Sequence, residues 1–344
     1  MTREVLENLY AAASGAGRLL ILPHNDPDPD AIASAVALRY LLAERLGMES
    51  TIAYQGIIGR AENKALVHYL DHPLELLIDA DLQQSSCLAL VDTQPGAGNI
   101  SLPPEATWPS APPHAGTILV IDHHAWCEET ATASFADVRP VLGATSTILT
   151  QYLQAASLEP SWSLATALFY GIKTMTMGLS RDTSPDDAAA YSYLQPRIDV
   201  GALAKIERAQ VPADYFRSFD ATLRAARMYD GLILAYIDVL SYPDLAAEMA
   251  DVFLRLEKAQ WVICMGVYQG ALILSVRARS QEHPAEELAQ AIVAGEGCAG
   301  GHGTMAGGQI PLGDAGAEQT ALLLCRRALQ HLGIPAEGAG EPLI

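Results

Sequence analysis

The chain has 344 residues, half of them apolar and 18% charged, a composition typical of a globular protein with room for two domains. Its formal net charge of −19 disfavours long duplex nucleic acid as a partner, because duplex binding depends largely on neutralising phosphates. No apolar run approaches the roughly 20 residues that span a bilayer. We therefore expect no membrane partner. The five cysteines are widely spaced, so we expect reduced thiols and a cytoplasmic protein.

Residues 1–184 alternate short apolar strands with helices. We expect a first helix at about 2–15, then strands at 18–23, 50–55, 87–92 and 117–122, with helices at about 31–46 and 63–69 between them. A strand at 135–141 follows, and two further helices cover about 145–156 and 162–174. This alternation is typical of an α/β fold with a parallel sheet.

Three of these strands end in polar groups. They lead into His24, Asp28 and Asp30, into Asp92, and into Asp122-His123-His124. Because parallel strands present ligands at their carboxyl ends, we expect these side chains to share one crevice. Carboxylates and imidazoles without cysteine suit Mn²⁺ or Mg²⁺. The sequence therefore predicts a divalent metal centre of the kind that supports two-metal hydrolysis.

The start of the helix at 145–156 has two interpretations. Its first turn follows Gly143-Ala144-Thr145-Ser146-Thr147, which offers free backbone amides and hydroxyl groups. These groups could contact a substrate phosphate, because anions bind at helix N-termini. They could equally form an ordinary helix cap.

The second half of the chain differs in pattern. Residues 185–226 are predicted to be helical, with acidic and basic residues interleaved, and to connect the two halves. Strands are expected at 232–237, 261–268 and 271–277, the last two joined by Gln269-Gly270 as a hairpin. A glycine-rich loop at 300–308 follows, in which backbone amides can approach a phosphate or a nucleobase closely.

Taken together, these motifs resemble the DHH phosphoesterase superfamily in its DHH plus DHHA1 form. The resemblance rests on His24-x3-Asp28-x-Asp30-Ala31, on Asp122-His123-His124 and on Gly300-Gly301-His302, which is similar to the Gly-Gly-His segment of DHHA1 domains. It implies an α/β parallel-sheet DHH domain at 1–184, a helical linker at 185–226 and a smaller α/β DHHA1 domain at 227–344. The active site would lie in the cleft between the domains.

The resemblance also implies roles for individual residues. His24, Asp28 and Asp92 would bind one metal ion, and Asp30, Asp92 and His123 the other, so that Asp92 bridges two ions of Mn²⁺ or Mg²⁺. His124 would face the substrate phosphate, and Asp122 would orient a ligand. A substrate clamp in the second domain would consist of Arg277, Arg279, Gly300, Gly301 and His302.

One position departs from the family pattern. Residues 171–176 resemble a family segment, Gly-Ile-x-Thr-Asp-Thr, whose aspartate binds the second metal ion, but this chain has Met175 at that position. A thioether does not replace a carboxylate on Mn²⁺ or Mg²⁺, so the second site is expected to be weaker. Asp182, seven residues further on, is a candidate substitute.

Three functional hypotheses follow. The first is a phosphoesterase that hydrolyses phosphodiester or phosphomonoester bonds of short nucleotides, namely oligoribonucleotides, cyclic dinucleotides or phosphoadenosine phosphate. The second is a degenerate relative that binds a nucleotide or a metal ion without turnover, as Met175 suggests. The third is an exopolyphosphatase or pyrophosphatase. The sequence leaves the substrate, the physiological metal and the oligomeric state open, a homodimer included.

Overall fold

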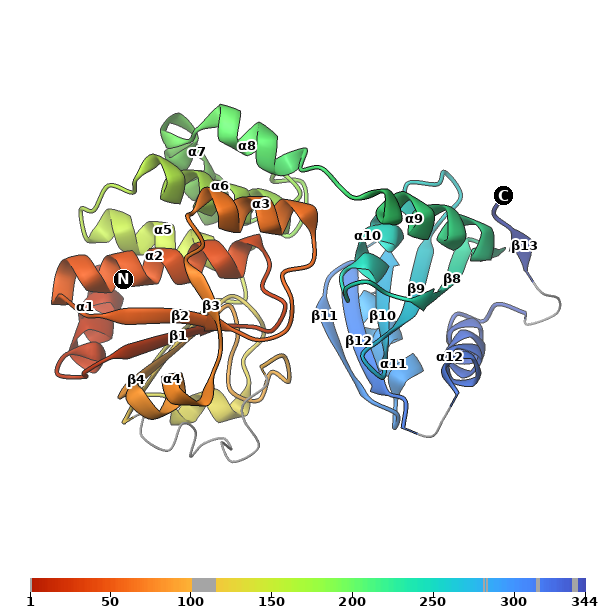
Figure 1. Ribbon diagram of the computed structural model, residues 1–344, viewed down its shortest axis with the longest axis horizontal. Coiled ribbons are helices and arrows are strands. Elements are labelled where there is room, and N and C mark those ends of the chain that lie inside the picture. Colours follow the sequence, from red (N-terminus) through yellow and green to blue (C-terminus); the bar gives the residue numbers. More distant parts are fainter. Residues whose placement is uncertain (1, 101–115, 281, 283, 314–315, 336–339) are drawn as a thin grey trace. The chain divides into compact units, whose positions relative to one another are not determined.

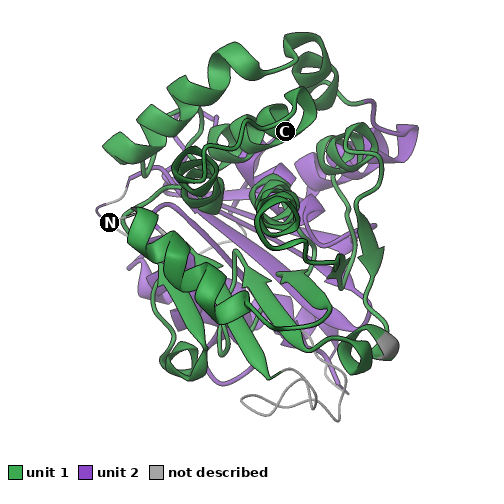
Figure 2. Cartoon of the chain, turned by 90° about the vertical axis from the view of Figure 1, so that its left-hand side faces the viewer, with its two compact units in different colours: residues 1–209 green, residues 210–344 purple. Residues whose placement is uncertain are grey.

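The computed structural model describes residues 2–100, 116–280, 282, 284–313, 316–335 and 340–344, with all side chains except those of Thr2, Ala80 and His302. The chain forms two compact units, Met1–Ala209 and Gln210–Ile344 (Figures 1 and 2). Each unit has its own sheet and its own apolar core. In the described ranges, no helix is both long enough and apolar enough to cross a bilayer.

The first unit contains a parallel six-stranded sheet in the order β3-β2-β1-β4-β5-β6. Its strands are β1 (Leu19–Pro23), β2 (Ser50–Tyr54), β3 (Leu74–Leu76), β4 (Cys87–Val91), β5 (Thr117–Asp122) and β6 (Phe135–Val138). The strands β1 and β4 are buried along their whole length, which explains why they read as unbroken apolar runs. The predicted parallel α/β fold is confirmed.

Helices cover both faces of this sheet. They are α1 (Thr2–Ala13), α2 (Pro29–Leu46), α3 (Ala61–Tyr69), α4 (Asp79–Gln84), α5 (Thr145–Ala155), α6 (Trp162–Met175), α7 (Pro185–Leu194) and α8 (Val200–Glu207), with 3₁₀ turns η1 (Glu128–Thr132) and η2 (Gln195–Arg197). Along β1, Leu19 and Ile21 join the larger core with α2, α5 and α6, whereas Leu20 and Leu22 join a smaller core on the α4 side (Figure 1). This alternation follows from the two-residue period of a strand.

The order of strands explains where the polar motifs meet. Chain order runs outward from β1 through β2 to β3, then restarts at β4 on the other side of β1 and continues to β6. Adjacent strands whose connections leave in opposite directions form a crevice at their carboxyl ends, where α/β proteins bind ligands. The residues after β1 and β4 therefore face each other across this crevice.

The segment 185–226 does not form the separate linker that we predicted. Helices α7 and α8 belong to the first unit, because Ala190, Leu194, Leu203 and Ile206 are buried in its core. Helix α9 (Ala213–Ala225) belongs to the second unit. The boundary thus falls between residues 209 and 210, because apolar side chains on α7 and α8 pack in the core of the first unit.

The second unit contains a seven-stranded sheet in the order β11-β12-β10-β9-β8-β7-β13. Its strands are β7 (Arg227–Tyr229), β8 (Leu232–Val239), β9 (Trp261–Tyr268), β10 (Ala271–Ala278), β11 (Cys298–His302), β12 (Met305–Pro311) and β13 (Glu341–Pro342). Among the described strands of this second sheet, only β8 and β9 pair in parallel. Helices α11 (Ala285–Val293) and α12 (Ala317–His331) pack on one face, and α10 (Leu245–Phe253) packs on the other.

Two regions of this sheet, the β9–β10 turn and residues 300–308, can be compared with what the sequence predicted. The β9–β10 hairpin is confirmed, and its turn residues Gln269 and Gly270 both have positive φ, as a two-residue turn of this type requires. Residues 300–308 are not the expected loop, because Gly300 and Gly301 lie in β11 and pair with β12. A Cβ atom on Gly301 would lie 2.3 Å from the carbonyl oxygen of Met305, so glycine permits this close pairing.

Candidate metal centre

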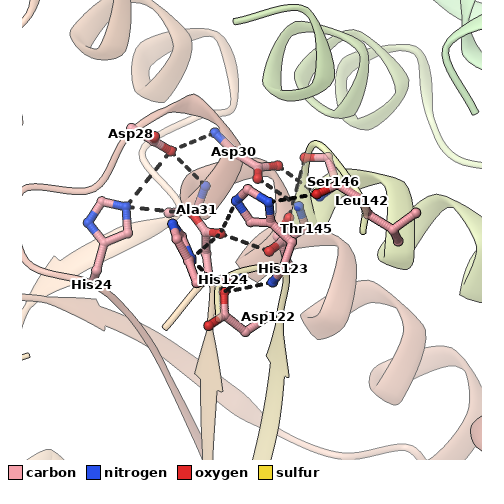
Figure 3. A network of polar contacts seen from close by, with 12 residues as sticks. His24, Asp28, Asp30, Ala31, Asp122, His123, His124, Leu142, Thr145 and Ser146 are labelled. Carbon is pink, nitrogen blue, oxygen red and sulfur yellow. Dashed lines mark hydrogen bonds and ion pairs between the residues drawn. The ribbon is translucent and has the colours of Figure 1, made fainter. Parts of the chain in front are cut away.

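Side chains that follow β1, β4 and β5 converge at the carboxyl edge of the first sheet (Figure 3). The centre of the group is Asp92, whose side chain is buried. Asp92 has a φ of 61°, an unusual left-handed conformation for a non-glycine residue directly after a strand. Such strained positions are found disproportionately at functional sites. The strand therefore ends in a turn that aims a carboxylate at its neighbours.

Three imidazoles surround this carboxylate. His24 Nε2 lies 3.6 Å from Asp92 Oδ2, and His123 Nε2 lies 3.6 Å from Asp92 Oδ1. His124 Nδ1 lies 3.9 Å from the same Oδ1 atom. Asp92 Oδ1 also accepts a hydrogen bond of 2.8 Å from the hydroxyl of Thr145. Asp92 is thus positioned between two groups of ligands, as a bridging carboxylate must be.

Asp28 fixes the first of these groups. It is the N-cap of α2, and its Oδ1 atom accepts hydrogen bonds from the amides of Asp30 at 2.9 Å and Ala31 at 3.0 Å. Pro29 follows at the first helical position, where proline is favoured. The cap holds the carboxylate 3.9 Å from His24 Nε2. The helix start thereby delivers Asp28 to the side of the centre that His24 occupies.

The tautomers of the adjacent histidines are set by their hydrogen bonds. His123 Nδ1 lies 3.1 Å from the carbonyl oxygen of Leu142, which can only accept, so Nδ1 carries a proton and Nε2 faces Asp92. His124 Nδ1 donates to Asp122 Oδ1 at 2.8 Å, which directs its Nε2 atom away from Asp122. His123 is buried whereas the His124 side chain is 36% exposed. His123 is therefore suited to bind a metal ion and His124 to contact a substrate.

Asp122 is itself held by Gln94, a residue that the sequence predictions missed. The Gln94 amide nitrogen donates to Asp122 Oδ2 at 2.7 Å and to the carbonyl oxygen of Ala125 at 2.8 Å. Gln94 Oε1 accepts from Cys127 N at 3.1 Å and from Thr130 Oγ1 at 2.9 Å. The Gln94 amide therefore has four protein partners while being almost fully buried. Its position two residues after Asp92 is the only sequence signal that could have identified it.

Asp30 occupies a different environment from the one predicted. Its Oδ2 atom accepts from Thr145 N at 2.8 Å and its Oδ1 atom from Ser146 N at 2.7 Å, so both oxygens bind the first turn of α5. Asp30 thus caps α5 from a distant part of the chain, and the amides that could have bound a substrate phosphate are already engaged. Each carboxylate oxygen has a second lone pair, so Asp30 can still serve as a weaker metal ligand.

A second buried carboxylate, Asp187, supports the same loop. Its Oδ2 atom accepts from Gly143 N at 2.8 Å, and its Oδ1 atom accepts from the Thr147 hydroxyl at 2.5 Å. The loop also carries Leu142, whose carbonyl oxygen orients His123. Asp187 has no recognisable signal in the sequence, because the loop that it supports lies some 40 residues away in the chain.

Two imidazoles of the centre, those of His24 and His124, hold protons strongly. Burial lowers the pKa of His24, but contact with Asp92 and the charges of Asp28 and Asp92 outweigh burial and raise it to about 10. Burial also opposes protonation of His124, but Asp122 and Asp92 raise its pKa to about 9. Protons on imidazoles therefore supply positive charge where a group of buried carboxylates requires it.

The carboxylates respond in opposite directions. Burial and the charges of Asp92 and Asp28 raise the pKa of Asp30 well above its ordinary value, although its contacts with Ser146 lower it. Burial would raise the pKa of Asp92 as well, but contact with His24 and the charges of the neighbouring histidines hold it well below the usual range. Asp92 is therefore ionised at neutral pH, as a metal-bridging ligand needs to be.

The donor set fits divalent cations. Ligand atoms of His24, Asp28 and Asp92 lie within 4.8 Å of one another, and so do those of Asp92, His123 and His124, so Asp92 is common to both groups. Because His124 Nδ1 already donates to Asp122, we assign His124 to the substrate side of the second group. Oxygen and imidazole donors without thiolate suit Mn²⁺ or Mg²⁺.

The segment that carries Met175 approaches the centre through α6. A Cβ atom on Gly171 would lie 2.5 Å from Ser146 Oγ and 3.1 Å from the Asp30 Cα atom, so glycine allows α6 to pack directly beside Asp30. Met175 lies one helical turn further on, and its carbonyl oxygen accepts from Arg181 Nη2 at 2.8 Å. Asp182 lies 3.6 Å from Arg181 Nε. Asp182 belongs to no candidate group of His, Cys, Asp and Glu metal ligands among the described residues.

The predicted clamp residues of the second unit have structural partners. Arg277 Nε donates to Asp251 Oδ1 at 2.5 Å, and Arg279 donates to the carbonyl oxygens of Ala259, Leu254 and Leu256 just beyond α10. These bonds engage part of each guanidinium group. Gly300 and Gly301 form part of β11, and the side chain of His302 lies outside the described part of the chain. The proposed clamp and its cleft therefore stay predictions, to which the arginine contacts give no support.

Comparison with known proteins identifies relatives of both sequence and fold. Residues 18–172 match the DHH family, N-terminal domain. The uncharacterised protein MJ1633 of Methanocaldococcus jannaschii is 39% identical over 296 residues, which cover 86% of this chain and 58% of that protein. The chain thus spans little more than half the length of that relative.

Two solved structures share the fold. An exopolyphosphatase-related protein from Bacteroides fragilis has a TM-score of 0.69 at 15% identity, with 96% of each chain covered. RecJ in complex with Mn²⁺ from Thermus thermophilus has a TM-score of 0.56 at 13% identity, with 96% of this chain and 54% of RecJ covered. At these identities the likeness establishes a common fold across both units.

Proposed function

Because the chain is a member of the DHH superfamily, whose proteins are typically metal-dependent phosphoesterases, we propose that it hydrolyses phosphoester bonds of short nucleotides with two divalent ions. The observation that carries the proposal is the shared carboxylate of Asp92, which lies between two groups of metal-compatible ligands. The candidate substrates are oligoribonucleotides, cyclic dinucleotides and phosphoadenosine phosphate. The presence of Mn²⁺ in the RecJ structure is consistent with Mn²⁺ as the ion.

The residues divide the work as follows. His24, Asp28 and Asp92 would hold one ion, and Asp92 with His123 would hold the other, with Asp30 as a weaker ligand. When bound, the ions would supply Lewis-acid activation and neutralise phosphate charge. Asp122, oriented by Gln94, keeps the Nδ1 proton of His124 in place.

His124 is the residue we assign to the substrate phosphate. Its side chain is 36% exposed, and Asp122 and Asp92 raise its pKa to about 9 in the metal-free protein, so Nε2 can carry a proton at neutral pH. That N–H group can donate a charge-assisted hydrogen bond to a phosphoryl oxygen. The buried imidazole of His123 lacks this access, so the two adjacent histidines serve different purposes.

The direct test is a substrate screen with the metal-loaded protein. Chelator-treated protein would be reloaded with Mn²⁺ or Mg²⁺ and assayed on a dinucleotide, a cyclic dinucleotide, phosphoadenosine phosphate, pyrophosphate and polyphosphate. We expect metal-dependent turnover of at least one nucleotide and little turnover of polyphosphate. Turnover of polyphosphate alone would instead favour exopolyphosphatase activity, and no turnover with any metal would contradict the proposal.

The alternative, a non-catalytic binding module, is motivated by Met175. If the second ion lacks one carboxylate, Met175→Asp should increase Mn²⁺ affinity at that site by about tenfold or more and raise turnover, because an added hard ligand stabilises the ion. Calorimetric Mn²⁺ titration with a parallel phosphodiesterase assay would measure both effects. Two equally tight sites in the unmodified protein would show that Met175 is not a deficiency. Inactivity of both forms would favour the binding module.

A further inference from the structure

A tryptophan is exposed beside the candidate metal centre. The Trp126 side chain follows the Asp122-His123-His124 motif by two residues and is 53% exposed. Consecutive Cα atoms are about 3.8 Å apart, so the backbone of Trp126 lies within roughly 8 Å of that of His124. A large apolar side chain in water at the edge of a polar site is typical of a binding surface rather than of a core.

The exposure of Trp126 is fixed by its neighbours. The Gln94 side chain donates to the carbonyl oxygen of Ala125 at 2.8 Å and accepts from Cys127 N at 3.1 Å, so both residues flanking Trp126 are anchored to one buried amide. The same amide donates to Asp122, which orients His124. One side chain therefore positions both the imidazole that faces the substrate and the loop that carries the indole.

The loop is also held further along. The Thr130 hydroxyl donates to Gln94 Oε1 at 2.9 Å, and Thr130 is buried. The Glu129 side chain packs over Gly96, where a Cβ atom would lie 2.3 Å from Glu129 Oε2 and where φ is 81°. The segments that follow β4 and β5 are thus joined on both sides of Trp126. A loop with this support places its exposed ring reproducibly.

The charge of the chain indicates what such a ring would bind. With a net charge of −19, the protein gains little general attraction for a phosphate ester. A nucleotide would therefore depend on the metal ions for its phosphate and on uncharged contacts for its base. Stacking on an aromatic ring supplies such contacts and tolerates any base, because every base has a π-face.

We propose that Trp126 is the platform on which the nucleobase of a bound nucleotide stacks while its phosphate lies at the Asp92 centre. This inference rests on the proposed function, and it adds the residue that would recognise the base of the nucleotide. It also assigns a binding role to the short segment between the histidine pair and η1. Stacking of one base is expected to change affinity by about 5- to 150-fold, which is roughly 1–3 kcal/mol.

The test compares two ligands that differ by the base alone. Binding of adenosine monophosphate and of ribose 5-phosphate to the Mn²⁺-loaded full chain would be measured by calorimetry, which requires no turnover. Variants would be Trp126→Ala, Trp126→Phe and, as a matched control, Trp162→Ala. Trp162 is also exposed, at 66%, but it begins α6, nine residues from Gly171 beside Asp30 and thus roughly 13 Å along the helix.

We expect Trp126→Ala to weaken adenosine monophosphate binding by about tenfold without changing ribose 5-phosphate binding. Trp126→Phe should retain most of the affinity, since it keeps an aromatic face, and Trp162→Ala should match the unmodified protein. The inference is overturned if Trp126→Ala leaves adenosine monophosphate binding unchanged or weakens both ligands equally. It is also overturned if the unmodified protein binds ribose 5-phosphate as tightly as adenosine monophosphate.

The outcome is separable from that of the proposed function. Absence of hydrolysis with preserved base-selective binding would remove the phosphoesterase proposal and keep the stacking role. Hydrolysis of nucleotides without base-selective binding at Trp126 would keep the phosphoesterase proposal and remove the stacking role. Intrinsic tryptophan fluorescence gives an independent measurement. Stacking of adenosine monophosphate on Trp126 should quench part of the fluorescence, and this quenching should be lost in Trp126→Ala and preserved in Trp162→Ala.

Discussion

The two units provide partners for their charged groups in different ways. At the strand ends of the first unit, Asp28, Asp30 and Asp92 face one another, and imidazole protons supply the nearby positive charge. In the second unit, Arg277 and Arg279 are matched locally by Asp251 and by backbone carbonyl oxygens. The first arrangement gains from an added cation, whereas the second is already balanced.

This contrast separates a candidate site from a structural network. Buried carboxylates that are close together are costly unless a cation or a proton compensates them. Guanidinium groups that bind carbonyl oxygens at a helix end stabilise that end. Judged by residue type alone, both regions would be candidate functional sites. The partners of the side chains distinguish them.

The shared carboxylate provides the sharpest test. Asp92→Asn keeps the size of the side chain but removes the charge that both ligand groups require. We expect metal binding at both sites to be lost and phosphoesterase activity to fall by about 10³-fold or more, because the ions supply most of the charge stabilisation. Mn²⁺ calorimetry and the phosphodiesterase assay would measure this, with the exposed Glu44→Gln as control. Retention of one tight site would show that Asp92 does not bridge.

Gln94 tests whether the orientation of His124 matters. Gln94→Ala removes the donor that holds Asp122 Oδ2, so the hydrogen bond from His124 to Asp122 loses its support. Partners of this kind contribute about 10- to 100-fold in metal affinity or activity, and we expect kcat to fall within that range. The exposed Gln210→Ala should have no effect. An unchanged kcat in Gln94→Ala would mean that Asp122 holds His124 unaided.

The protonated imidazoles predict how metal binding depends on pH. His24 and His124 have pKa values raised to about 10 and about 9, so both carry protons throughout pH 6–8 in the metal-free protein. An ion that binds His24 must displace its proton, so Mn²⁺ affinity should rise with pH by up to about tenfold per unit for each proton released. Calorimetry in buffers of different ionisation enthalpy would count these protons. An affinity independent of pH would remove His24 as a ligand.

Sequence patterns located the strand ends well because the physics there is local. The strands β1, β4 and β5 were predicted because buried strands in a parallel sheet are apolar along their length and end abruptly at polar residues. The strand β3 was missed, since it has three residues and exposes Leu76. The strands β11 and β12 were missed because glycine has low strand propensity. Their conformation is decided by the pairing of β12 with β10 and of β11 with β12.

The partners of the site residues could not be read from the sequence. Asp30 stays a predicted ligand of the second metal ion, but its contacts with the first turn of α5, whose amides lie more than 100 residues away in the chain, were not predicted. Arg277 was expected to clamp substrate, but it pairs with Asp251 on a different element. Sequence identifies which residues carry useful chemistry. The tertiary fold decides which of them already have partners.

The smallest effect on activity is expected in the second unit. Arg279→Ala removes hydrogen bonds to the carbonyl oxygens of Leu254, Leu256 and Ala259, which follow the end of α10. Each such charge-assisted bond contributes up to about 1–3 kcal/mol, and water compensates part of the loss at this partly exposed site, so we expect a decrease of roughly 1–2 kcal/mol in the free energy of unfolding. Urea denaturation followed by circular dichroism would measure it.

The same variant should leave catalysis intact, which is what distinguishes a helix-capping arginine from a substrate clamp. At a temperature where the protein remains folded, kcat/KM on the best nucleotide should stay within about twofold, because the guanidinium is directed to backbone carbonyl oxygens of its own unit. Arg224→Ala, which removes an exposed arginine of α9, controls for the loss of charge alone. A rise in KM specific to Arg279→Ala, without a change in stability, would show that Arg279 contacts the substrate. The second unit would then share the functional role that we assign to the first.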